Sequence, residues 1–184
     1  MTQVWNSTNR YGAVAIALHW IGAAGVIWMY FLGEAVEHAK ADELGREAII
    51  AAIRLHVSVG MVFFAFLVAR ILSHIAQKQP RPLSPHRVLS PLARAVQWGF
   101  LAMISVQILT GPMVVWSSGR PIAIFQTVFI PSPMARIEWL HEALETVHAL
   151  APNLFWPLLV LHVAGALKHT LFDRDPTLIR MLRP

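Results

Sequence analysis

The sequence predicts an all-α membrane protein, a four-transmembrane-helix up-and-down bundle that forms a single domain over residues 1–184. Composition is the first observation: 56% of the residues are hydrophobic and 14% are charged, whereas a soluble globular domain is about one-quarter charged. The second is a series of four apolar runs, each long enough for the roughly 20 residues that a membrane-spanning helix needs. No internal repeat divides the chain.

The first half of the chain contains two of these runs. Residues 14–35 form the first predicted span, and the polar, acidic residues 37–47 indicate a connector outside the membrane. The second predicted span covers residues 48–75, with Arg70 near its end. The chain is then broken by prolines at positions 80, 82 and 85, because proline removes a helical hydrogen-bond donor.

The second half contains the other two runs. The third predicted span covers residues 92–116 and contains no histidine. Residues 117–140 are rich in proline, glycine and aromatic side chains, which predicts a loop with a short interfacial helix. The fourth predicted span covers residues 144–172, and the prolines at positions 152 and 157 are expected to kink it.

The basic residues predict which side of the membrane the chain ends occupy. With four spans both termini share one side, and eight of the ten acidic residues fall on the opposite side. The side of the termini carries ten of the 15 lysines and arginines, namely Arg10, Arg70, Lys78, Arg81, Arg87, Arg94, Lys168, Arg174, Arg180 and Arg183. Cytoplasmic segments carry this excess of positive charge. We therefore expect both termini in the cytoplasm.

Four histidines within the spans fall into two pairs at matching depth. His148 and His162 lie fourteen residues apart, about 21 Å along a helix, so that one lies in each half of a hydrocarbon core about 30 Å thick. Because consecutive spans run in opposite directions, His19 is expected at the depth of His162, and His56 at the depth of His148. Ionisable residues inside a span mark functional sites.

Such pairs predict two b-type haems, each with its iron held by two imidazoles from different helices. The absence of cysteine excludes disulfides, iron–sulfur clusters and c-type haem attachment. Arg70 is expected to meet a haem propionate. Room for a porphyrin edge is expected beside three glycines that follow a histidine by about a turn, Gly22, Gly60 and Gly165.

Other interpretations of the histidines stay open. His141 competes with His148 for the outer iron, although about 31 Å of helix would separate it from His162. The histidines could also form interhelical hydrogen bonds, or carry zinc or protons in a transporter. The lack of Asp and Glu in the spans, apart from Glu34 and Glu145 at their ends, opposes a transporter. His169, next to Lys168 at the cytoplasmic interface, is expected to contact a propionate or a quinone carbonyl.

Taken together, these residues resemble the bacterial cytochrome b561 family of small di-haem membrane proteins, over nearly the whole chain. The resemblance lies in Leu18-His19-Trp20 within the opening residues 11–20, Leu55-His56-Val57-Ser58-Val59-Gly60, Gly119-Arg120-Pro121, the block 161–169 and the tail 175–181. Members often have two adjacent histidines after the ligand of the fourth helix, whereas Thr170 follows His169 here.

The resemblance implies a multi-pass protein of the bacterial inner membrane with two haem b groups and one-electron transfer to or from a quinone. For some members it also implies oxidation of superoxide at the outer surface. Arg54, Arg120 and Arg136 are expected to attract such an anionic donor. We expect membrane lipid, a quinone and a small one-electron donor as partners, and no nucleic acid. The alternative is a haem b membrane anchor that relays electrons between a soluble dehydrogenase or hydrogenase and the quinone pool.

Overall fold

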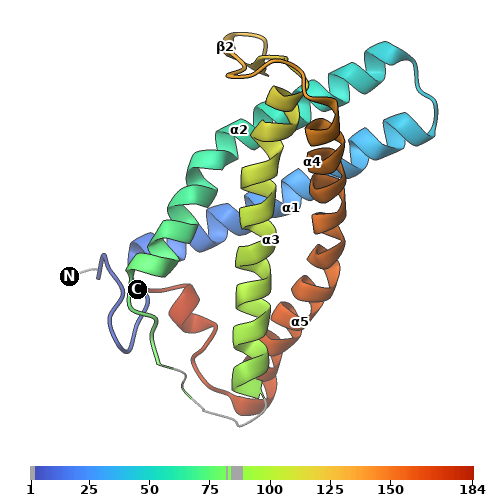
Figure 1. Cartoon of the computed structure of the whole chain (residues 1–184). Coiled ribbons are helices and arrows are strands. Elements are labelled where there is room, and N and C mark those ends of the chain that lie inside the picture. The colour runs from blue at the N-terminus through green and yellow to red at the C-terminus, as the bar shows by residue number, and fades with distance from the viewer. Residues whose placement is uncertain (1–2, 82, 84–88) are drawn as a thin grey trace.

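The computed structural model describes residues 3–81, 83 and 89–184, so that Pro82, Pro85 and Arg87 lie outside the described residues. Four helical segments are long and apolar enough to cross a membrane, which confirms the predicted bundle. They are α1 (Ala13–Ala41), α2 (Arg46–Ala76), α3 (Leu89–Ser117) and a fourth segment made of α4 (Glu138–Leu150) and α5 (Phe155–Lys168). Consecutive segments alternate in direction, and both chain ends lie at one end of the bundle (Figure 1). We call this the terminal end.

The opposite end of the bundle carries a β-hairpin. The prediction of a short interfacial helix within residues 117–140 is therefore wrong. Strand β1 (Ile122–Ile124) pairs antiparallel with β2 (Val128–Ile130). The intervening residues 125–127 form a tight turn, in which Phe125 and Gln126 have φ values of 47° and 58°. Residues 122–130 are mostly β-branched or aromatic, and such side chains favour a strand over a helix. We call this the hairpin end.

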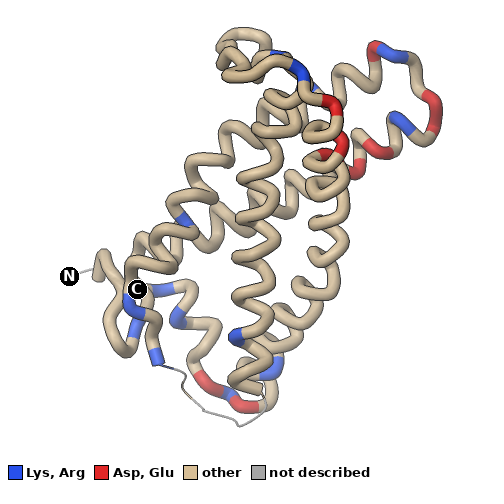
Figure 2. The backbone as a smooth tube through the Cα atoms, in the orientation of Figure 1, with Lys and Arg blue, Asp and Glu red and all other residues tan. Residues whose placement is uncertain are grey.

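The connector between α1 and α2 is shorter than the predicted residues 37–47, because both helices extend into it. Residues 37–41 continue α1, and only residues 42–45 join the two helices. An ion pair one turn apart, between Lys40 and Glu37 at 3.1 Å, supports this extra helix. At 29 residues, α1 is about 44 Å long, which exceeds a hydrocarbon core of about 30 Å. Figure 2 shows that the projecting end of this helix pair is rich in acidic residues.

The fourth segment is interrupted where the sequence predicts a kink. A 3₁₀ turn, η1 (Ala151–Leu154), separates α4 from α5, with Pro152 among its first residues. A proline has no N–H to donate and its ring crowds the preceding turn, which breaks the regular α-helical ladder. After α5 the chain makes a π-helical turn, η2 (His169–Asp173), and ends with the short 3₁₀ turn η3 (Ile179–Met181).

Hydrogen bonds between distant segments close the terminal end. The indole N–H of Trp20 in α1 donates to the carbonyl of Met181 at 2.7 Å. The guanidinium of Arg180 donates to the carbonyls of Asn9, at 2.5 Å, and Arg81, at 3.2 Å. The amino-terminal segment, the chain after α2 and the carboxy-terminal tail are therefore held together next to the first turns of α1.

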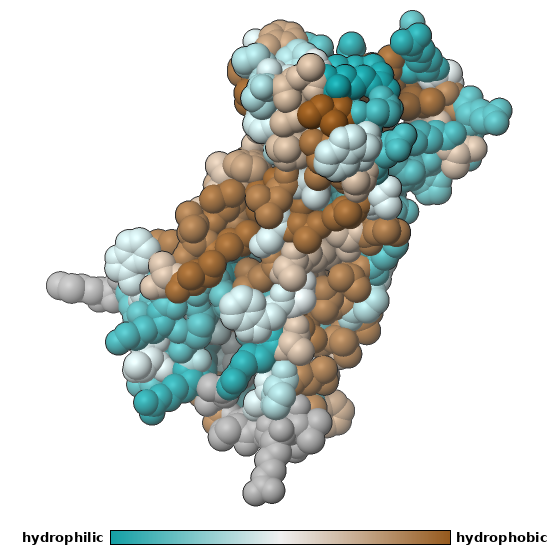
Figure 3. Space-filling model, viewed as in Figure 1, coloured by the Kyte–Doolittle hydropathy of each residue, from teal (hydrophilic) through white to brown (hydrophobic). Residues whose placement is uncertain are grey.

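The outward faces of the helices are apolar along the middle of the molecule. Large side chains such as Trp28, Phe31, Leu109 and Val160 are more than half exposed. Figure 3 shows a hydrophobic middle with hydrophilic regions towards the two ends. In water this much exposed apolar surface would be costly, whereas in lipid it is the favourable surface. The structure thus has the surface of a membrane-spanning bundle.

Ser58 fixes the hairpin to α2. Its hydroxyl is 1% exposed, donates to the carbonyl of Arg54 at 2.7 Å and accepts the backbone N–H of Phe125 at 2.8 Å. The hairpin is thereby held two residues along the chain from His56. A helical serine that bonds its own i−4 carbonyl still has acceptor capacity for a second partner, which Phe125 uses here.

Replacing Ser58 by alanine is expected to loosen the hairpin. The Phe125 N–H would lose its partner, at a cost of about 1–3 kcal/mol, so the unfolding temperature in detergent should fall and exchange of that amide should accelerate. Thr146→Ala is the control, because this exposed hydroxyl bonds only the carbonyl of Glu142. Unchanged exchange at Phe125 in Ser58→Ala would contradict the anchoring role.

Candidate functional site

Two of the predicted histidines face each other near the hairpin end. The ring centroids of His56 in α2 and His148 in α4 lie 6.1 Å apart, with the ring planes at 85°. The Nδ1 atom of His148 lies 2.8 Å from the hydroxyl oxygen of Thr110 in α3. The Nδ1 atom of His56 is buried and has no hydrogen-bond partner among the described residues. Two imidazoles from different helices therefore converge, and one leaves a buried nitrogen unsatisfied.

Two glycines that the sequence analysis did not single out lie against these rings. A Cβ atom on Gly33 of α1 would lie 3.7 Å from Cε1 of His56, and one on Gly111 of α3 would lie 3.4 Å from Cε1 of His148. The predicted Gly60 faces Met29 instead. No signal in the sequence marks Gly111, because periodicity does not show which face of a span meets a neighbouring helix.

A second pair lies toward the terminal end. The ring centroids of His19 in α1 and His162 in α5 are 6.0 Å apart, with the planes at 46°. Two aromatic rings pack edge-on against them: Trp20 against His19 at 5.2 Å and Phe100 of α3 against His162 at 5.8 Å. The two pairs thus come from three of the four spanning segments and lie at different depths, in the combination that the sequence predicts.

Arg70 lies close to the terminal-end pair. A Cβ atom on Gly22, one turn beyond His19, would lie 4.0 Å from Cγ of Arg70. The positive charge of Arg70 acts on both His19 and His162. Gly22 therefore borders the arginine rather than a ring, and Gly165 faces open space among the described residues. The arginine is available to an anionic group that lies next to this pair.

His141 does not join either pair. Its Nδ1 atom lies 3.0 Å from the carbonyl oxygen of Val114 and 3.3 Å from the hydroxyl of Ser117, which closes the hairpin end of α3. Its Nε2 atom lies 3.9 Å from a carboxylate oxygen of Glu145. The structure therefore sets His148, and not His141, opposite His56.

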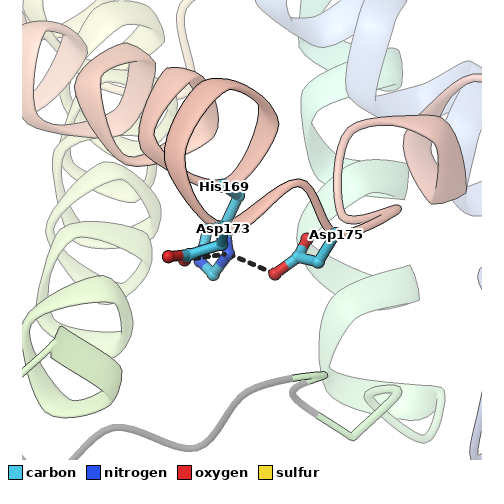
Figure 4. Close-up of side chains that lie close together, drawn as sticks. All are labelled: His169, Asp173 and Asp175. Carbon is cyan, nitrogen blue, oxygen red and sulfur yellow. Dashed lines mark hydrogen bonds and ion pairs between the residues drawn. The ribbon is translucent and has the colours of Figure 1, made fainter.

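His169 lies in a cluster of charged side chains at the terminal end (Figure 4). Its Nδ1 atom is 2.7 Å from Asp175 and 3.2 Å from Asp173, and Lys168 pairs with Asp173. Burial raises the pKa of Asp175, but hydrogen bonds from Thr177 and His169 outweigh it and hold that pKa below its ordinary value. The three acceptor groups lie close enough to hold a cation. However, Lys168 already neutralises one carboxylate, so the cluster is an ion-pair network in the described structure.

The geometry of both histidine pairs fits a metal ion held between two imidazoles, as in a bis-histidine haem. Two imidazoles bound to one metal ion through bonds of about 2 Å have ring centres about 6 Å apart, which is the spacing of both pairs. The buried Nδ1 of His56 makes no hydrogen bond of ordinary geometry, which is consistent with an imidazole whose partner is a bound group. Neutral nitrogen donors without carboxylates nearby suit an iron that the porphyrin already neutralises in part.

Comparisons with known proteins agree with this geometry. The sequence profile described as prokaryotic cytochrome b561 matches residues 10–184. The chain is 31% identical to cytochrome b561 homolog 2 of Escherichia coli strain K12, over 96% of this chain and 93% of that protein. It is 27% identical to cytochrome b562 of Cereibacter sphaeroides, over 95% of this chain and 96% of that protein.

The match spans all four helices, both histidine pairs and the hairpin between α3 and α4. A fold of four apolar helices with paired, half-buried imidazoles is consistent with transmembrane electron transfer through b haems. This chain belongs to the prokaryotic cytochrome b561 family, whose members are multi-pass haem b proteins that transfer electrons across bacterial membranes.

Proposed function

We propose that this protein carries single electrons across the inner membrane through two b-type haems and delivers them to a quinone. One haem would be held by His56 and His148, and the other by His19 and His162. The observation that supports this most directly is the equal spacing of the two pairs, 6.1 and 6.0 Å between ring centroids, at two depths of the bundle. Haem b supplies a one-electron Fe(III)/Fe(II) couple when it is bound.

In this proposal the side chains of the protein hold the haems and shield them from water. Two imidazoles on each iron leave no open coordination position, which favours electron transfer over binding of oxygen. Arg70 would neutralise a propionate at the terminal-end site. Phe155 lies midway along the chain between His148 and His162, is 2% exposed and stacks on Tyr30 with 4.8 Å between ring centroids. These rings exclude water between the two levels.

Substitution of the four histidines is expected to remove the haems in two steps. His56→Ala or His148→Ala should lower the b-type haem content of the purified protein from two per chain to one, and His19→Ala or His162→Ala should remove the other. His141→Ala is the control, because its nitrogen contacts Val114 and Ser117. The measurement is the reduced-minus-oxidised spectrum with quantified haem. If His141→Ala lost as much haem as His148→Ala, the ligand set would be wrong.

The distribution of charge supports one orientation of the chain in the membrane. Figure 2 shows basic residues towards the terminal end and most acidic residues at the opposite end. The excess of lysine and arginine at the terminal end supports a cytoplasmic location for both termini. The hairpin end would then face the outer side. Electrons would enter at the His56–His148 site and leave at the His19–His162 site.

A small anionic donor such as superoxide would approach the hairpin end. The three arginines expected to attract it differ in whether they are already paired with a carboxylate. Glu138 accepts two hydrogen bonds from Arg136, and this pairing raises the pKa of the guanidinium. Within the described residues, Arg54 and Arg120 make no ion pair. A charge that is not paired locally attracts an anion more strongly at short range.

Removal of the Arg120 charge is expected to slow reduction of the haems by superoxide. Arg120→Ala should lower the rate a few-fold at low ionic strength and less at high salt, because salt screens exposed charges beyond about 10 Å. Lys78→Ala is the control, since it removes the same charge at the terminal end. Stopped-flow absorbance measures both. If the rate of haem reduction depended equally on salt in the wild type and in Arg120→Ala, attraction of superoxide by Arg120 would be contradicted.

The quinone would bind near His169 and Lys168. His169 is partly exposed, and Asp175 holds its Nδ1 atom at 2.7 Å, so the Nε2 atom can serve a ligand. A positioned imidazole beside a quinone oxygen can give or take the proton that accompanies quinone reduction. The side chain would reach the quinone from the end of α5, on the same helical run as His162.

Loss of this imidazole is expected to affect only the last electron transfer. His169→Ala should slow reoxidation of the reduced haems by a soluble quinone at least tenfold, as for other proton-transfer groups, with unchanged haem content and unchanged reduction by dithionite. Asp175→Asn should show a smaller effect of the same kind. Thr170→Ala is the control, because its exposed hydroxyl bonds only the carbonyl of Ala166. Wild-type reoxidation in His169→Ala would place the quinone elsewhere.

One observation favours a second function, that of a membrane anchor for a soluble dehydrogenase or hydrogenase. The α1–α2 pair projects at the hairpin end and carries five acidic residues, Glu34, Glu37, Asp42, Glu43 and Glu47. Such an end would suit a basic protein partner more than an anion. Haem reduction that requires a copurifying protein, and that superoxide alone does not produce, would favour this function.

A further inference from the structure

Thr110 makes two hydrogen bonds in a position that the sequence analysis left without a role. It lies in α3, the span without a predicted ligand, and is 7% exposed. Its hydroxyl donates to the carbonyl of Val106, one turn earlier, at 2.7 Å. The same oxygen lies 2.8 Å from Nδ1 of His148. The residue therefore joins the backbone of α3 to one imidazole of the hairpin-end pair.

These two bonds determine the tautomer of His148. A hydroxyl has a single proton to donate, and Thr110 gives it to Val106. The oxygen of Thr110 can then only accept from His148, which places the imidazole proton on Nδ1. In a neutral imidazole the other nitrogen, Nε2, then carries the free lone pair, and this is the nitrogen that binds a metal.

The next residue in the chain, Gly111, lies against the same ring. A Cβ atom on Gly111 would lie 3.4 Å from Cε1 of His148, at the close limit of ordinary van der Waals contact. The glycine thus lets the imidazole lie against α3 within reach of the Thr110 hydroxyl. The two adjacent residues act together: one makes room for the ring and the other orients it.

The other three imidazoles have no hydroxyl partner among the described residues. Nδ1 of His56 is buried and makes no hydrogen bond of ordinary geometry, although the backbone of Leu32 interacts with this imidazole. Within residues 3–81, 83 and 89–184, His19 and His162 make ring–ring contacts but no hydrogen bond. The two proposed haem sites therefore differ in the hydrogen bonds of their ligands. At the hairpin-end site His148 donates an N–H to Thr110, whereas neither imidazole of the terminal-end site has a hydrogen-bond partner among the described residues.

We propose that Thr110 is a positioning residue that lowers the midpoint potential of the hairpin-end haem relative to the terminal-end haem. The inference rests on the proposed function. An imidazole that donates its second N–H is a more basic ligand, and a more basic ligand stabilises the ferric state. With both haems bound, one electron would pass downhill from the hairpin-end site to the terminal-end site: the first centre would be oxidised and the second reduced, and no bond or proton would change partner.

The test is a redox titration of the haem-containing protein with three variants. Thr110→Val removes the acceptor at nearly constant volume and should raise one of the two midpoint potentials by about 59 mV, which is a tenfold change for a one-electron couple, and leave the other unchanged. Thr110→Ser keeps the hydroxyl and should titrate as the wild type. Thr170→Val is the control for a threonine-to-valine change on a helix away from both rings.

Each outcome decides the proposal. An unchanged or lowered potential in Thr110→Val, with both haems bound, overturns the role of Thr110 but leaves the proposed function intact. If Thr110→Val loses the hairpin-end haem, retention of both haems in Thr110→Ser supports positioning by the hydroxyl, and loss in both variants overturns it. A wild-type protein that binds no haem would instead refute the proposed function.

Discussion

The structure depends on the convergence of imidazoles from different helices inside a hydrocarbon core. Polar side chains are costly there unless they find partners, and the interior of a membrane bundle offers few. His56 and His148 approach to 6.1 Å without bonding each other, as do His19 and His162 at 6.0 Å. A metal ion shared by the two rings, such as the proposed haem iron, would offset this cost for both rings at once. The rest of the fold keeps each ring at its depth and holds its helix in register.

The two ends of the bundle are secured by different means. At the hairpin end, Ser58 ties the β-hairpin to α2, and His141 closes the end of α3. At the terminal end, Trp20 and Arg180 connect the first helix to both chain termini. Between these ends the contacts are mainly apolar. The polar bonds that define the depth of each histidine pair are therefore concentrated near the membrane surfaces, where water is available to compete and charges are tolerated.

Much of the architecture could be predicted because hydropathy and helical period act over long distances in the sequence. The four spans and the combination of His19 with His162 and of His56 with His148 required only the alternation of helix direction. The hairpin was missed because residues 117–140 were judged by their prolines and glycines, and not by the β-branched and aromatic residues between them. Thr110, Gly33 and Gly111 were missed because periodicity gives the spacing of residues on a helix, but not which face meets a neighbouring helix. Those contacts are decided by packing.

The 3₁₀ turn between α4 and α5 separates the two ligands that the fourth segment contributes. In one continuous helix, any change of twist or tilt would move His148 and His162 together. With the break at residues 151–154, the helix before it and the helix after it can each settle against its own neighbours, α4 beside Thr110 and α5 beside Phe100. A substitution in one half of the molecule would therefore adjust one proposed haem site without disturbing the other. The break would make the two proposed sites separately adjustable.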